Sequence, residues 1–174
     1  MVLLRDFEGG VYTFKSNSEC LDLGIPTPVL PEKVRGHMVL VLGGVPRKLD
    51  YVKVMTITST LKEDGDYVPI APTLKNGYTI QLQLRNYLVW HHRETLRFFP
   101  VLQKYSYLKI DSYYEVPIQM LVNVRDHFNN AFVIRSKGQG GLRQLQDYVR
   151  RRDLIRTTES HDAGPSSMIQ SDEK

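Results

Sequence analysis

Five short runs rich in Val, Ile, Thr and Tyr constrain the fold of this chain more than any other feature. They are MVLVLGG, YVKVMTITST, YVPIAP, YTIQLQLRNYLVW and SYLKIDSYYEV, and Gly, Pro and Asn lie between them. β-Branched and aromatic residues favour strands, while Gly, Pro and Asn favour turns. In YTIQLQLR apolar and polar residues alternate strictly, as in a strand with one buried face. The sequence therefore predicts a mainly β fold, either a small, strongly bent sheet or a partly open barrel.

A helix is expected after these strands, in GLRQLQDYVRRRDLI. Leu142, Leu145 and Val149 recur there at helical spacing. The preceding GQGG is expected to form a hinge or cap, although its backbone donors could instead face an anion. Beyond Arg156 the chain is polar and short of large apolar groups. We expect one domain over residues 1–156, with an N-terminal arm and a C-terminal helix, followed by a disordered tail over residues 157–174.

The charge of the chain is concentrated in this expected domain. In the tail, Glu159, Asp162, Asp172 and Glu173 against Lys174 give a net charge of −3. The total of +4 therefore leaves the first 156 residues at +7. A basic body favours an anionic partner, with nucleic acid as the first expectation.

The N-terminus and the cysteine usage indicate the compartment. Arg5, Asp6 and Glu8 leave no room for a secretory apolar core, and no run has the length of a membrane span. The single cysteine, Cys20, has no internal disulfide partner, which fits a reducing compartment. We expect a cytoplasmic protein without a membrane partner.

The motifs of common cofactors and metals are missing. The histidines at 37, 91, 92, 127 and 161 show neither HxxxH nor HExxH spacing, and no GxxxxGK, GxGxxG or GxSxG motif occurs. We expect neither a cofactor nor a metal site.

The segment WHHRETLRFFP interleaves aromatic and cationic side chains. Single-stranded RNA is commonly held by aromatic faces that stack on unpaired bases and by cations that contact phosphates. Trp90, His91 and Arg93 are therefore candidates for RNA contacts. The alternative is a turn of helix, ended by Pro100, whose aromatic residues enter the core while its cations remain solvated.

The run SYLKIDSYYEVP places Tyr107, Lys109 and Asp111 on one face of a strand, because side chains alternate between faces. One interpretation is a solvated edge of a small barrel. The other is a site in which Asp111 accepts a proton from a hydroxyl and Lys109 neutralises charge on a phosphate. The residues of this run alone leave both open.

Three segments in order carry a resemblance to a known family. They are RGHMVLVL, VKVMTITST and SYLKIDSYYEVPIQML, which together span Arg35 to Leu121. This succession resembles the MazF/PemK-like toxins, in which a glycine and an Arg-Pro-Val-Leu-Val type strand precede a Pro-Ile-Thr-Ser strand end and a Ser-x-x-Arg-x-Asp strand. The chain departs from that pattern at Met38, Val39, Thr56 and Lys109. A lysine at position 109 keeps the charge of the family arginine but lacks its bidentate fork.

The resemblance implies an SH3-like barrel and a metal-independent endoribonuclease that cuts single-stranded RNA through attack of the 2′-hydroxyl. It also implies a homodimer that a protein antitoxin silences. Under it, Asp111 and His37 would exchange protons, and Lys109, aided by Arg35, would stabilise the transition state. Thr58 and Ser59 would line the groove. Independently of the resemblance, Tyr107 is a further candidate for an RNA contact.

Two alternatives follow from the same sequence. The first is a non-catalytic SH3-like barrel that binds RNA or a protein, since a fold does not fix a function. The second is an interaction domain whose C-terminal helix packs Leu142, Leu145 and Val149 on a partner or on a second copy.

Overall fold

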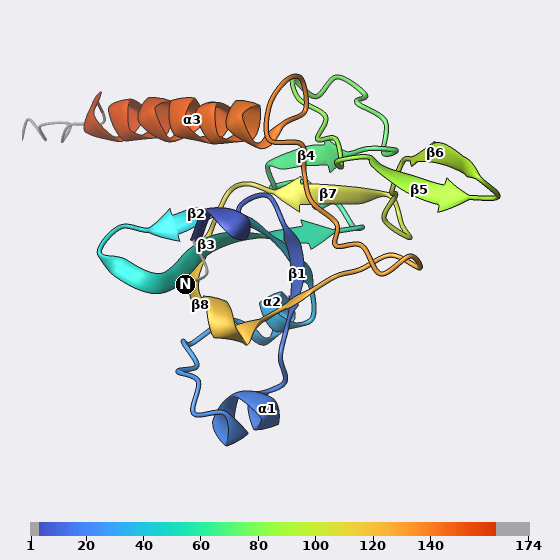
Figure 1. Ribbon diagram of the computed structural model, residues 1–174. Helices are drawn as coiled ribbons and strands as arrows, with labels where there is room; N and C mark the ends of the chain where they lie inside the picture. The colour runs from blue at the N-terminus through green and yellow to red at the C-terminus, as the bar shows by residue number, and fades with distance from the viewer. Residues whose placement is uncertain (1–3, 163–174) are drawn as a thin grey trace, which may run out of the picture.

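The computed structural model describes residues 4–162, which form an antiparallel sheet, a separate β-hairpin and a C-terminal helix (Figure 1). The strands are β1 (Val11–Phe14), β2 (Met38–Val45), β3 (Lys48–Thr58), β4 (Tyr67–Ile70), β5 (Tyr87–His91), β6 (Glu94–Phe98), β7 (Ser106–Lys109), β8 (Tyr114–Pro117) and β9 (Leu121–Asn123). The helices are α1 (Asn17–Asp22), α2 (Glu32–Arg35) and α3 (Leu142–Asp162), with short 3-10 helices η1 (Leu4–Asp6) and η2 (Ile118–Met120).

The main sheet has seven strands and runs in the order β4-β7-β3-β2-β1-β9, with β8 also paired to β3. β3 is long enough to pair with two strands along one edge, because Val52 faces Val116 of β8 while Ile57 faces Leu108 of β7. η2 turns the chain from β8 into β9, and β9 pairs with β1. The sheet bends strongly and is not closed. Its strands and the helix α3 confirm the expectation of a mainly β fold with a C-terminal helix.

The inner side of the bend is filled by one apolar cluster. Tyr12, on β1, is 4% exposed and belongs to a cluster that also holds Val39, Val41, Val52, Val54, Val116 and Leu121. These residues come from β1, β2, β3, β8 and β9. In Figure 1 the ribbons of β1, β2, β3 and β8 curve around a common centre. Burial of such side chains is the main force that holds the strands in this bend.

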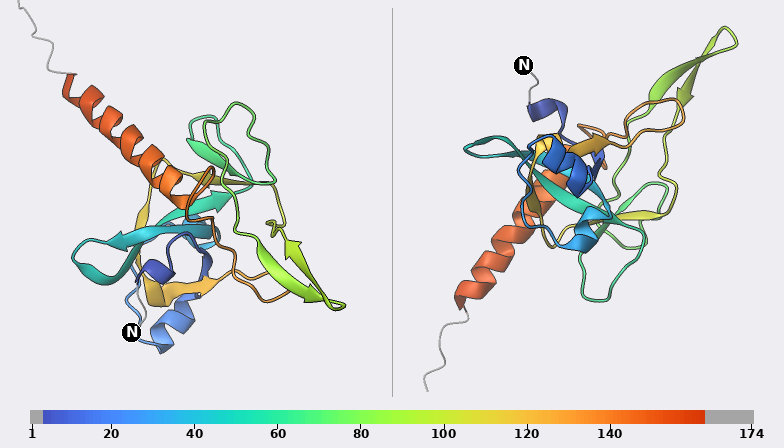
Figure 2. Two further views of the ribbon diagram at one scale, coloured as in Figure 1. Left: turned by 45° about the horizontal axis from the view of Figure 1, so that its top comes forward. Right: turned by 90° about the horizontal axis from the view of Figure 1, so that it is seen from below.

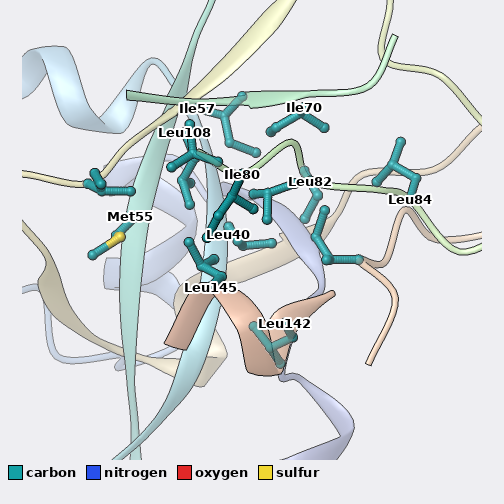
Figure 3. Close-up of a cluster of buried hydrophobic side chains, with 14 of the residues drawn as sticks. Leu40, Met55, Ile57, Ile70, Ile80, Leu82, Leu84, Leu108, Leu142 and Leu145 are labelled. Atoms are coloured by element: carbon teal, nitrogen blue, oxygen red, sulfur yellow. The ribbon is translucent and has the colours of Figure 1, made fainter. Parts of the chain in front are cut away.

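A second apolar cluster lies on the other face of β2 and β3, and Figure 3 shows most of it. Leu40, Met55 and Leu108 extend from the sheet toward Ile80 and Leu82, which lie between β4 and β5. They also extend toward Leu142 and Leu145 of α3. Leu142, Leu145 and Val149 are all buried in this cluster. The hypothesis that these three residues pack on a partner or on a second copy is therefore wrong: they form the protein's own core.

α3 confirms the predicted helix but is longer than expected. It continues to Asp162, so residues 157–162, predicted to be disordered, are helical, and the expected tail over residues 163–174 lies outside the described residues. Its first turns pack on the sheet, while its last turns extend away from the body (Figure 2). Leu154 and Ile155 in that extension are 63% and 59% exposed.

Two local expectations are wrong. The segment 90–99, given a turn of helix as one alternative, forms the hairpin β5–β6, in which Trp90 faces Thr95 and Leu88 faces Arg97. The segment YTIQLQLR keeps its predicted alternation, with Ile80, Leu82 and Leu84 buried, but it makes single bridges to Ile70 and Ile134 instead of forming a paired strand. The alternation predicted burial correctly, whereas strand pairing depends on neighbours that lie far away in the sequence.

Candidate functional site

A cavity of about 510 Å³ opens where β2 begins and where β3 ends. Its apolar lining comes from the second cluster described above, with Met38, Ile57, Leu102, Val124 and Phe132. Its polar lining includes His37, Thr58, Ser59, Lys104, Ser106, Arg125, Asp126 and His127. An apolar lining with a few converging polar groups is typical of a ligand site. We call it the His37 cavity.

His37 reaches the cavity from the segment that connects α2 to β2. Its backbone N–H donates to the carbonyl oxygen of Val34 over 3.1 Å, which holds the chain as it enters β2. Met38 pairs with Ile57, so His37 lies beside the end of β3, where Thr58 and Ser59 also line the cavity. Two predicted RNA contacts therefore lie beside the predicted proton-transfer group. Arg35 is partly buried at the end of α2 and lies outside the cavity lining.

A turn that follows β9 supplies another part of the cavity lining. Asp126 organises it, because Oδ1 accepts the backbone N–H groups of Phe128 and Asn130, both over 2.9 Å. The other oxygen, Oδ2, accepts a hydrogen bond from the hydroxyl of Tyr87 on β5. Arg125 donates through Nη1 to the carbonyl oxygen of Asn129 over 2.8 Å. These bonds hold the chain on both sides of His127.

Aromatic packing attaches the same turn to the hairpin. The ring of Phe98, on β6, lies 5.4 Å from the ring of His127 and 5.0 Å from that of Phe128, both in edge-to-face geometry. Phe98 also contacts Tyr87 at 5.2 Å. The hairpin therefore supports the turn that carries His127.

The cavity continues into a second hollow, of about 490 Å³, across the loop before β7. The two share Ser59, Leu102, Gln103 and Lys104, and the second adds Pro72 and Tyr105. Ser106, which lines the first cavity, is held by a 2.7 Å hydrogen bond from its N–H to Oγ1 of Thr73. The two hollows therefore adjoin at the loop that carries Lys104.

Lys109 and Asp111 lie elsewhere. They form an ion pair with 3.3 Å between Nζ and Oδ2, and neither lines the His37 cavity. Lys109 is three residues along β7 from Ser106, or about 10 Å at the rise of a strand. It also projects from the opposite face, because Ser106 and Leu108 are buried while Tyr107 and Lys109 are partly exposed. The predicted alternation is confirmed, but it places Tyr107, Lys109 and Asp111 away from the cavity that His37 lines.

The ion pair with Asp111 stabilises the charged form of Lys109. The pKa of Lys109 is raised: burial alone would lower it, but the charge of Asp111 and its hydrogen bond outweigh burial. Oδ1 of Asp111 is buried and accepts no hydrogen bond from any of residues 4–162. The pair therefore holds Lys109 in its charged form, with the neighbouring Tyr67 and Tyr114 favouring the same form.

The hairpin carries the other predicted RNA contacts on its solvent side. Trp90 is 73% exposed, Leu88 is 66% exposed, and His91 and Arg93 lie at or near the tip. In Figure 2 the hairpin projects from the body as an arm. One of its faces contacts the His127 turn through Phe98, and the other presents Trp90, Leu88 and Arg97 to solvent.

His127, Arg125 and Lys104 line the cavity but were not among the residues predicted from the sequence. The first two occur in RDHFNN, where a cation and an imidazole precede a turn-forming Asn pair. That combination was the local signal for a polar turn that could carry a site. Its position beside β2 could not be predicted, because it depends on the pairing of β1 with β9, which are far apart in the sequence. Within residues 4–162 no group of three His, Cys, Asp or Glu side chains could hold a metal ion, and none of the helices there is long and apolar enough to cross a membrane.

Comparisons of the chain with models of known families, with curated proteins and with solved structures find no significant match.

Proposed function

We propose that this protein is a metal-independent endoribonuclease of the MazF/PemK-like kind, and that it binds single-stranded RNA in the His37 cavity. One observation carries the proposal: a single cavity combines imidazole, hydroxyl and cationic side chains, contributed by His37, Thr58, Lys104 and Arg125 among others. Cleavage of RNA without a metal needs groups that transfer protons and groups that stabilise negative charge on phosphorus. The cavity supplies both kinds.

The strand arrangement supports the expected SH3-like barrel as the finer description of the fold. The pairs β9–β1, β1–β2, β2–β3 and β3–β8 make a bent five-strand path around one apolar cluster, and η2 connects its two ends. β4 and β7 extend the sheet from the other half of β3. The barrel alone does not imply cleavage, so the functional proposal depends on the cavity.

RNA fits this site by shape and charge. The two adjoining hollows, lined by residues from His37 to Tyr105, can receive an RNA backbone, with Lys104 and Arg125 as phosphate contacts. The hairpin contacts the His127 turn through Phe98, and Trp90 on its other face offers an exposed aromatic ring to an unpaired base. The net charge of +7 over the first 156 residues favours the encounter with a polyanion.

This placement moves the chemistry away from Lys109 and Asp111. We assign those two residues to an ion pair beside the sheet and keep His37 as a proton-transfer group. The homodimer and the antitoxin that the resemblance implies stay predictions.

The test is incubation of the purified protein with a long unstructured RNA in EDTA, with analysis of fragments and end groups. We expect fragments that end in 2′,3′-cyclic phosphate, formed at least about 100-fold more slowly by His37→Ala, the usual scale of a lost acid or base. Asp111→Asn discriminates between the two placements, because it abolishes cleavage only if the chemistry is at Asp111. RNA that stays intact at high protein concentration would overturn the proposal.

A non-catalytic RNA-binding module is the second candidate function. The exposed side chains of Leu88, Trp90 and Arg97 on one face of the hairpin favour it, since they provide a binding surface that needs no cavity. In this case RNA would stay intact but would shift in a binding gel, and binding would weaken with salt because phosphate contacts release counterions.

A further inference from the structure

We propose that His127 is the second proton-transfer residue of the site and acts with His37; this assignment rests on the proposed ribonuclease function. Both histidines line the His37 cavity, and they enter it from different parts of the fold. Asp111, the group that the resemblance would pair with His37, lies outside that cavity. The site therefore has a candidate acid and a candidate base without Asp111.

The chemistry needs two such groups on opposite sides of one phosphate. One imidazole takes the proton of the 2′-hydroxyl as the 2′-oxygen bonds to phosphorus. The other, as imidazolium, gives a proton to the 5′-oxygen as the P–O5′ bond breaks. The products are a 2′,3′-cyclic phosphate and a 5′-hydroxyl, and no metal, oxidant or other reactant is consumed. Imidazole suits both roles, because it changes charge in the neutral range.

Preorganisation of the turn separates His127 from an ordinary surface histidine. Two backbone N–H groups and the Tyr87 hydroxyl hold Asp126, and a bridge between Arg125 and Ala131 closes the turn. Phe98 from the hairpin contacts the imidazole ring of His127 at 5.4 Å. A group fixed in this way needs little reorganisation during the reaction. The hairpin thus acts as a positioning element for His127.

Two cations of the cavity lining, Arg125 and Lys104, can stabilise charge on the phosphate. Arg125 precedes the turn and uses Nη1 to hold the carbonyl oxygen of Asn129, so its remaining guanidinium donors are available to a phosphate. Lys104 lies on the loop before β7, which also lines the cavity. Cations at both places can stabilise the extra negative charge of a five-coordinate phosphorus.

A substrate with a sulfur atom in place of the 5′-oxygen at the scissile bond tests the assignment. A thiolate leaves without protonation, so this substrate bypasses the general acid but still needs the general base. Once the preferred cleavage position is mapped, the full chain, His37→Ala, His127→Ala and His127→Asn are compared on the normal and the sulfur-containing RNA. His92→Ala is the matched control, because His92 is exposed on the hairpin and does not line the cavity.

We expect His37→Ala and His127→Ala each to slow cleavage of normal RNA at least about 100-fold. Only one of the two should recover on the sulfur substrate, and it identifies the general acid. His127→Asn should behave like His127→Ala, and His92→Ala should stay close to the parent protein. Thermal unfolding of each variant establishes that it is folded.

Other outcomes overturn the assignment and separate it from the proposed function. If the parent protein does not cleave RNA at all, both fail. If it cleaves RNA and His127→Ala retains its rate within a few-fold, only the role of His127 fails. A slow His127→Ala that shares the response of His37→Ala to the sulfur substrate, with both recovering or neither, shows that the two residues do not divide the acid and base roles.

Discussion

Replacement of Leu145 by Ala tests whether α3 belongs to the core. Leu145 has no exposed surface and packs in the cluster that also holds Leu40 and Ile80 (Figure 3). On the same helix, Leu154 lies in the extension and is 63% exposed. Both leucines lie on α3, so Leu154→Ala is a matched control for the change in helix propensity that a Leu→Ala replacement brings.

The expected cost follows from burial. Removal of a buried leucine side chain to alanine costs about 2–5 kcal/mol, because transfer free energy is lost and a cavity remains. The Leu145 side chain is fully buried between α3 and the sheet, so we expect a loss of about 3–4 kcal/mol, near the middle of that range. For a domain of this size, about 2–4 °C of melting temperature accompany each kcal/mol. The melting temperature should therefore fall by roughly 6–16 °C, whereas Leu154→Ala should change stability by less than about 0.5 kcal/mol.

Urea unfolding followed by far-ultraviolet circular dichroism measures both variants. The midpoint should shift strongly for Leu145→Ala with little change in slope, as for a change in stability without a change in the surface exposed on unfolding. A loss below about 1 kcal/mol, or equal shifts for the two variants, would refute the packing of α3 on the sheet. Sedimentation of both variants at several concentrations controls for a contribution from self-association.

Three further predictions follow from the structure. Gly140→Ala should destabilise the protein strongly in the same urea assay, because φ is +72° at this position and a Cβ would overlap the carbonyl oxygen of Gln81. A stability close to that of the parent protein would contradict this geometry. Burial raises the pKa of Tyr12 above the ordinary tyrosine value of about 10, so its neutral hydroxyl contributes its full stabilisation below that pH. The free energy of unfolding should fall as the pH rises through this value, and it should fall less in Tyr12→Phe. Equal slopes of stability against pH for the two proteins would exclude Tyr12 as a cause. Trp90 is the single tryptophan and is exposed, so a short oligouridylate should quench its fluorescence in a salt-sensitive manner. Trp90→Ala should weaken binding roughly 10-fold or more, which is the scale of one stacked base. If the fluorescence stays unchanged while a gel shows binding, the RNA binds away from the arm.

Local patterns predicted much of the fold. The alternation in residues 78–85 identified Ile80, Leu82 and Leu84 as buried, and the helical spacing of Leu142, Leu145 and Val149 identified the inward face of α3. Both follow from the geometry of one element. The hairpin was not predicted. Trp90 pairs with Thr95 near a tip at which His92 and Arg93 both have positive φ, and neither histidine nor arginine is typical of such a turn.

The candidate site could be predicted only in part. His37, Thr58 and Ser59 were identified, and register brings them together at the ends of β2 and β3. His127 was missed because its turn reaches the cavity through contacts with β1 and β5, which no local pattern encodes. Lys109 and Asp111 were placed on the correct face of β7, but which face borders a cavity depends on the packing of α3 and the segment 80–84 over the other face.

The pairing of β1 with β9 also sets an order for biosynthesis. One edge of β1 pairs with β2, where Val11 faces Leu40. Its other edge pairs with β9, where Tyr12 faces Asn123, and β9 is synthesised much later. During synthesis this edge has no partner until the ribosome has released residues up to Asn123, and an unpaired strand edge is a template for aggregation. Contacts so distant in sequence also slow folding, because a long loop must close before they form. The nascent chain is therefore most vulnerable to aggregation in the interval between the emergence of β1 and that of β9.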